Sequence, residues 1–132
     1  MENKTIAQFC ISMPPRTKKN HQRILISPKS GKPFIAPSSD YAKYAKAAGW
    51  YIRWPNEPIK EPVNVRCLFY MPTRRRCDLT NLLEAIDDVL VAAGVLKDDD
   101  FTVVAGHDGS RVLYDKERPR TEVVIERIGE GA

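Results

Sequence analysis

Hydrophobic and polar residues alternate along several stretches of the chain with the two-residue period of a β-strand. Residues 6–12 (IAQFCIS) and residues 121–128 (TEVVIERI) show this alternation, and each stretch predicts a strand. Residues 63–71 (VNVRCLFYM) and residues 101–106 (FTVVAG) are rich in β-branched and aromatic residues, so they predict two further strands. Residues 23–36 place the apolar runs RILIS and PFIA on either side of PKSGK, which predicts a β-hairpin.

Two segments have the period of a helix instead. Residues 39–54 begin with capping residues and space their apolar side chains helically, so they predict a first helix. The second helix begins near Asp78, whose carboxylate is placed to cap it, and ends at Gly94. Its apolar residues fall within an arc of roughly 120°: Leu79, Leu82, Leu83, Ile86, Val89, Leu90 and Ala93. We therefore expect one face of this helix to pack on the sheet, with Asp87 and Asp88 off that face.

These elements together predict a single α+β domain over residues 1–132, with two main helices packed on a small mixed or antiparallel sheet. Phe101 and Val103 are expected in the core of that sheet. Three cysteines without a CxxC pair argue against a disulfide framework and against a zinc site. No apolar run is long enough to cross a membrane and the first residues lack a signal-peptide pattern, so we expect a cytoplasmic protein.

The charges are segregated, although the net charge of +4, from 21 Lys and Arg against 17 Asp and Glu, is only mildly basic. The segment between Pro14 and Pro33 has no acidic residue and contains Arg16, Lys18, Lys19, Arg23, Lys29 and Lys32. Three more basic residues stand together at Arg74, Arg75 and Arg76. The acids gather elsewhere, notably at Asp87, Asp88, Asp98, Asp99 and Asp100. This distribution indicates a protein that grips phosphates and also holds a cation.

The aspartates at the start of the second helix and beyond its end are the candidate metal ligands. If that helix lies back across the sheet, Asp99 and Asp100 come round beside Asp78 at one end of the sheet. Carboxylates crowded together raise one another's pKa unless a cation binds, and their oxygens suit Mg²⁺. Each feature also has a structural interpretation: Asp78 as a helix cap, the arginines as a solvated surface, and the aspartate run as a polar turn.

The stretch MPTRRRCDLTNLLEAIDDVLVAAGVLKDDDFTVV, residues 71–104, resembles the signature region of the RusA family of Holliday-junction resolvases. Members have a strand ending in MP, an arginine run, an Asp-Leu-(Asp or Thr)-Asn-Leu motif that opens a helix, and an Asp-Asp pair past a glycine. The resemblance is close over residues 63–105, and the basic PPRTKKN loop and the total length also agree. It implies a small homodimeric, Mg²⁺-dependent endonuclease, often carried by prophages, that cuts symmetrically placed strands of a four-way DNA junction.

By this resemblance, Asp78 matches the first metal-binding aspartate of the family. Counting forward without a gap puts the second catalytic aspartate at Asp99 with Asp98 as its partner. Aligning on the following valines instead gives Asp99 with Asp100. The expected catalytic and metal-binding residues are therefore Asp78, Asp99 and Asp100, with Mg²⁺, or Mn²⁺ in its place, as the cofactor.

The remaining site residues follow from the charge pattern and the same resemblance. The expected DNA-binding residues are Arg16, Lys18, Lys19, Arg23, Arg74, Arg75 and Arg76, while Asn81 and Thr80 are expected to orient a ligand. Thr80 and Glu84 depart from the family, some of whose members have an acid and a lysine there. These departures leave open a protein of the same fold that binds junctions without cutting them. A nuclease that prefers flaps or forks is a further alternative. His107 is given no catalytic role.

Overall fold

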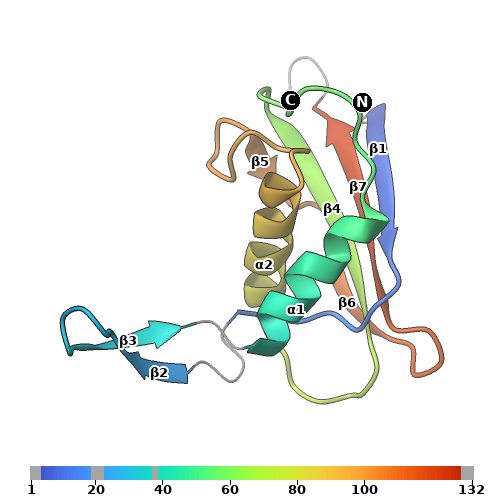
Figure 1. Ribbon diagram of the computed structural model, residues 1–132. Helices are drawn as coiled ribbons and strands as arrows, with labels where there is room; N and C mark the ends of the chain where they lie inside the picture. Colours follow the sequence, from blue (N-terminus) through green and yellow to red (C-terminus); the bar gives the residue numbers. More distant parts are fainter. Residues whose placement is uncertain (1–3, 19–22, 37–38, 129–132) are drawn as a thin grey trace.

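The computed structural model of the protein describes residues 4–18, 23–36 and 39–128 (Figure 1). The elements in these ranges are β1 (Lys4–Ile11), β2 (Arg23–Ile26), β3 (Pro33–Ala36), α1 (Ser39–Ala48), the 3₁₀ turn η1 (Gly49–Tyr51), β4 (Val63–Met71), α2 (Leu79–Ala92), β5 (Val104–Gly106), β6 (Arg111–Tyr114) and β7 (Arg120–Arg127). The predicted hairpin is confirmed, since β2 and β3 pair antiparallel with each other. The other strands form one sheet.

Strand β4 lies at the centre of the main sheet. It pairs antiparallel with β7, and β7 pairs antiparallel with the edge strand β1. On its other side, β4 pairs parallel with β5 near its start and with β6 near its end. The sheet is therefore mixed, which is one of the two arrangements that the sequence left open. Strand β6 is missing from the predicted strands because its four residues owe their conformation to distant pairing with β4 rather than to a local pattern.

Both helices cover the same face of this sheet (Figure 1). Alternation along β4 buries Val65, Cys67 and Phe69 on that face, and α2 packs the buried side chains of Leu82 and Ile86 into the same core. Burying one such side chain contributes about 1.5–3 kcal/mol relative to leaving it exposed. This core fixes α2 across the sheet and thereby fixes the positions of both of its ends.

Helix α1 is shorter than predicted. It ends at Ala48 rather than at residue 54, and the chain tightens into η1 before turning extended at Ile52, with φ −109° and ψ 119°. Gly49 follows the last α-helical residue, and glycine disfavours a continuing α-helix.

The expectation that Phe101 lies in the sheet core is wrong, because its side chain is 83% exposed, whereas Val103 is buried as expected. A turn precedes the strand: the backbone N–H groups of Val103 and Val104 donate to the carbonyl of Asp100. Strand β5 begins only at Val104. Among the described residues, no helix is long and apolar enough to cross a membrane.

Candidate active site

Asp78 caps the N-terminal end of α2, as the sequence predicts. Its backbone is extended, and its Oδ1 accepts hydrogen bonds from the N–H groups of Thr80 at 2.9 Å and Asn81 at 3.4 Å. Those donors have no partner inside the helix, so an acceptor here is worth about 1 kcal/mol. Only Oδ1 takes part in the cap, and the side chain is exposed. The other carboxylate oxygen is therefore accessible to solvent or to a cation.

The three consecutive aspartates lie in an exposed loop beyond α2. Asp98 Oδ1 accepts the N–H of Asp99 at 2.7 Å, and Asp100 Oδ1 accepts the N–H of Thr102 at 2.9 Å as well as the Thr102 hydroxyl. The hydroxyl, followed by that N–H, holds the pKa of Asp100 below its ordinary value. Among the described residues, the carboxylate of Asp99 has no hydrogen-bond partner. Asp99 therefore has both oxygens available to an external ligand.

Helix α2 separates Asp78 from the three consecutive aspartates. Its 14 residues span about 21 Å at 1.5 Å per residue. Figure 1 shows the loop that follows α2 beside β5, at the opposite end of the helix from its N-terminus, which Asp78 caps. After α2, the N–H groups of Val95 and Leu96 both donate to the carbonyl of Leu90, which keeps the chain at that end. No three His, Cys, Asp or Glu side chains of the described residues are close enough to hold a metal. The expectation that Asp99 comes round beside Asp78 is therefore wrong within one chain.

A buried carboxylate on α2 is paired with a histidine. Asp87 is 6% exposed, and its Oδ2 lies 2.8 Å from Nε2 of His107, which follows β5. Its Oδ1 is buried and has no partner among the described residues. Burial raises the pKa of Asp87, His107 opposes that shift, and the charge of Asp99 adds to it. Sequence reasoning missed this pair because Asp87 lies off the apolar arc of α2 and only the fold brings His107 to it.

Three consecutive arginines precede Asp78 in the chain. Arg74, Arg75 and Arg76 are exposed in the loop between β4 and α2, and none of them forms an ion pair with a described residue. The guanidinium carbon of Arg74 lies 4.3 Å from the centre of the Tyr114 ring, which is a cation–π contact. Unpaired guanidinium groups next to an exposed carboxylate suit a ligand that carries phosphates.

The other expected DNA-binding residues have different surroundings. Arg16 is exposed. Lys18 forms an ion pair with Asp88 of α2, and both side chains are about one-third exposed, so a phosphate would compete with Asp88 for this lysine. Lys19 lies outside the described residues. Arg23 stands at the start of β2, and its side chain lies outside the description.

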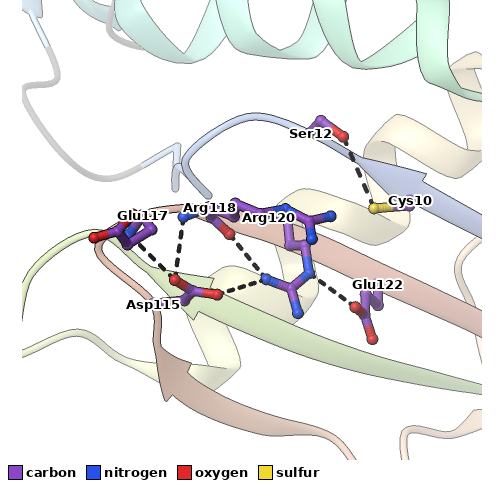
Figure 2. A network of polar contacts seen from close by, with 7 residues as sticks. All are labelled: Cys10, Ser12, Asp115, Glu117, Arg118, Arg120 and Glu122. Carbon is purple, nitrogen blue, oxygen red and sulfur yellow. Dashed lines mark hydrogen bonds and ion pairs between the residues drawn. The ribbon is translucent and has the colours of Figure 1, made fainter.

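A polar network that sequence reasoning did not anticipate holds the turn between β6 and β7 (Figure 2). Arg120 donates to Asp115 Oδ2 at 2.9 Å and to Glu122 Oε2 at 2.8 Å, and its guanidinium carbon lies 3.7 Å from the centre of the Tyr70 ring. The N–H groups of Arg118 and Glu117 both donate to Asp115 Oδ1 at 3.1 Å. The Arg118 N–H is the largest cause that lowers the pKa of Asp115, while Glu122 and then Asp115 raise the pKa of Arg120.

Comparison with known proteins relates this geometry to a family. The family model described as Endodeoxyribonuclease RusA matches residues 12–126. The chain belongs to the RusA family. It is also 32% identical over 96 residues to the crossover junction endodeoxyribonuclease RusA of Aquifex aeolicus (strain VF5). The aligned residues cover 71% of this chain and 72% of that protein. This RusA-family chain is therefore a nuclease that acts on DNA.

The region matched to RusA runs from the residue after β1 to the second-last residue of strand β7. It contains Asp78, the three consecutive aspartates, the arginine run, the Asp87–His107 pair and the hairpin β2–β3. The likeness thus extends over nearly the whole domain, well beyond residues 63–105, where the sequence resemblance is close.

Proposed function

We propose that this RusA-family protein is a homodimeric, Mg²⁺-dependent endonuclease that resolves four-way DNA junctions by paired, symmetric nicks. The observation that carries the proposal is that the two accessible carboxylates, Asp78 and Asp99, stand at opposite ends of α2 in a chain of a DNA-cutting family. The name of the Aquifex aeolicus relative, a crossover junction endodeoxyribonuclease, supports the junction as substrate.

Two half-sites on one chain require a second copy to make a whole site. In a dimer with a two-fold axis, placing α2 of one copy antiparallel to α2 of the other brings Asp78 of the first beside Asp99 of the second. The same rotation unites the remaining two carboxylates. The dimer then has two identical sites, separated by about the 21 Å length of α2.

Two sites related by a two-fold axis match the substrate. A four-way junction also has two-fold symmetry, so each site of the dimer meets an equivalent strand and the two cuts are symmetric. A site built inside one chain would have no such dependence on dimerisation.

The donor chemistry of these residues fits Mg²⁺, since accessible carboxylate oxygens are the ligands that this ion prefers. Asp78 of one copy would hold the ion with Asp99 of the other, and Asp100 would contribute its Oδ2. When bound, Mg²⁺ supplies positive charge beside the scissile phosphate and makes a nearby water a better nucleophile. Thr80 and Asn81, next to Asp78 in the first turn of α2, would orient that carboxylate or a water.

The arginine run has a separate task. Arg74, Arg75 and Arg76 would bind the phosphates on either side of the cut strand, since their guanidinium groups are exposed and without ion pairs among the described residues. Their binding energy positions the scissile phosphate over the carboxylates and should weaken as salt is added.

The experiment is a cleavage assay on a synthetic four-way junction with each strand labelled in turn. Wild-type protein should produce paired nicks in Mg²⁺ or Mn²⁺ and none in EDTA. Asp78→Asn and Asp99→Asn should remove cleavage while binding persists. The control Glu61→Gln removes an exposed acid from the loop before β4 and should cut like wild type.

Thr80 and Glu84 favour one alternative, a protein that binds junctions without cutting them. Tight junction binding with no cleavage in either metal would contradict the nuclease and support that binder. Equal or faster cutting of flaps and forks would contradict the junction as the preferred substrate.

A further inference from the structure

Hairpin β2–β3 stands apart from the sheet and the helices (Figure 1). Its strands pair only with each other, from Arg23 opposite Ala36 to Ile26 opposite Pro33. The hydrogen bonds found for the described residues 23–36 all lie within the hairpin. An isolated two-stranded hairpin is marginally stable in water, so an element of this kind is suited to gain order from a binding partner.

The tip of the hairpin is a defined turn that carries two lysines. Ser27 N–H donates to the Lys32 carbonyl at 2.9 Å, and Gly31 N–H donates to the Ser27 carbonyl at 2.8 Å. Gly31 has a φ of +69°, in the left-handed region that glycine tolerates best. Lys29 and Lys32 are both exposed on this turn, and neither forms an ion pair with a described residue.

Large apolar side chains are exposed just below that tip. Ile26 is 70% exposed and Phe34 is 46% exposed. Because Ile26 is opposite Pro33, the neighbour of Phe34, strand alternation places Ile26 and Phe34 on opposite faces of the ribbon. The hairpin thus offers an apolar residue on each face beneath a basic tip, and such exposure on a projecting element indicates a binding surface.

The charge identifies the occupant as DNA. No acidic residue occurs between Arg16 and Asp40. Lysines neutralise phosphates, a two-stranded ribbon fits a DNA groove, and Ile, Phe and Pro are among the side chains that wedge between bases. A second copy of this chain would cover the apolar residues but would leave Lys29 and Lys32 without a role. The hairpin also lies at the end of the domain that carries the start of α2 (Figure 1).

We propose that β2–β3 is a DNA-binding arm that holds a junction near its branch point. Lys29 and Lys32 contact phosphates, while Ile26 and Phe34 pack against bases that have lost a stacking neighbour at the branch. The inference rests on the proposed function for the choice of a junction as ligand. It adds a contact surface outside the carboxylates and the arginine run.

The first test measures junction binding in EDTA over a range of salt concentrations, so that no cutting occurs. Lys29→Ala/Lys32→Ala should weaken binding and reduce the slope of log K against log salt by about 1.8, or 0.9 per lost phosphate contact. The control Lys4→Ala/Lys60→Ala removes the same charge from two exposed lysines outside the hairpin. Lys4 is the first residue of β1, and Lys60 lies between η1 and β4. This control should leave the slope within about 0.5 of wild type.

The second test addresses the apolar contact. Phe34→Ser should lower junction affinity roughly fivefold or more, since stacking is worth about 1–3 kcal/mol per base, and should leave duplex affinity unchanged. A junction with 2-aminopurine at the branch should increase in fluorescence on binding wild type, and less on binding Phe34→Ser. Thermal unfolding of each variant checks that the domain stays folded.

The outcomes separate the arm from the proposed function. Wild-type binding with unchanged slope and affinity in both arm variants overturns the arm and leaves the nuclease proposal standing. No junction binding by wild type overturns both. If the arm variants weaken binding only by converting a dimer to monomers, as measured by analytical ultracentrifugation, the occupant is a second copy and the DNA arm is overturned.

Discussion

Asp78 combines a structural contact with a proposed chemical role, and substitutions can separate them. Its Oδ1 caps α2. We predict that Asp78→Ala lowers the free energy of unfolding by about 1 kcal/mol, while Asp78→Asn, which caps as well as aspartate, changes it by only a few tenths. Both variants should lose cleavage. Urea denaturation measures the first effect, and an asparagine variant as unstable as the alanine variant would contradict the capping geometry.

The buried carboxylate of Asp87 predicts a pH-dependent stability difference. Burial raises its pKa above the ordinary value of 3.8, so the folded protein binds this proton more tightly than the unfolded chain does. Ionising Asp87 therefore costs stability, beginning as the pH rises through 3.8 and levelling off above the folded pKa. Asp87→Asn removes this cost and can still accept a hydrogen bond from His107.

We therefore predict that the stability of Asp87→Asn relative to wild type increases as the pH rises above 3.8. Urea denaturation of both proteins at a series of pH values measures the difference, in which the titration of groups that do not interact with Asp87 cancels. A relative stability that falls as the pH rises would contradict the raised pKa.

Contacts between residues close together in the sequence could be predicted from the sequence. The capping role of Asp78 follows from its place before an apolar periodic segment, and the structure confirms it. The burial of Asp87 could not be read from the pattern, because it depends on His107 arriving from beyond β5. The exposure of Phe101 was missed for a similar reason, since the turn at Asp100 delays the start of β5.

At the scale of elements, the network around Arg120 gives a prediction for the turn between β6 and β7. Arg120 holds the carboxylate of Asp115, which accepts the N–H groups of Glu117 and Arg118. We predict that Arg120→Ala speeds hydrogen exchange at those two amides and leaves the amides of Val123 and Ile125, in the middle of β7, unchanged. Exchange followed by NMR measures this. Equal acceleration along β7 would mean that Arg120 stabilises the whole sheet instead.

The helices and strands were largely predictable from the sequence, but the contacts between elements distant in the sequence were not. The periods of β4 and α2 are strong, and both elements lie within a residue or two of their predicted bounds. The predicted proximity of Asp99 to Asp78 within one chain is wrong because the ends of a helix of 14 residues lie about 21 Å apart. The core fixes the position of each end of α2 over the sheet. The parallel pairing of β6 with β4 is equally non-local.

At the scale of the whole molecule, the proposed active unit is larger than one chain, because Asp78 precedes α2 and Asp99 follows it. In a dimer of the proposed kind, each site takes Asp78 from one copy and Asp99 from the other. A heterodimer of Asp78→Asn with Asp99→Asn then has one site with both substitutions and one site with neither. A site contained in a single chain would instead be damaged in both copies.

The most direct test is therefore to mix the two inactive variants, allow subunits to exchange, and follow junction cleavage strand by strand in Mg²⁺. We predict that the mixture regains activity that neither variant has alone, and that it makes single nicks rather than paired ones. A mixture that contains heterodimers, as confirmed with differently tagged copies, and yet cuts no strand would contradict a site shared between two chains.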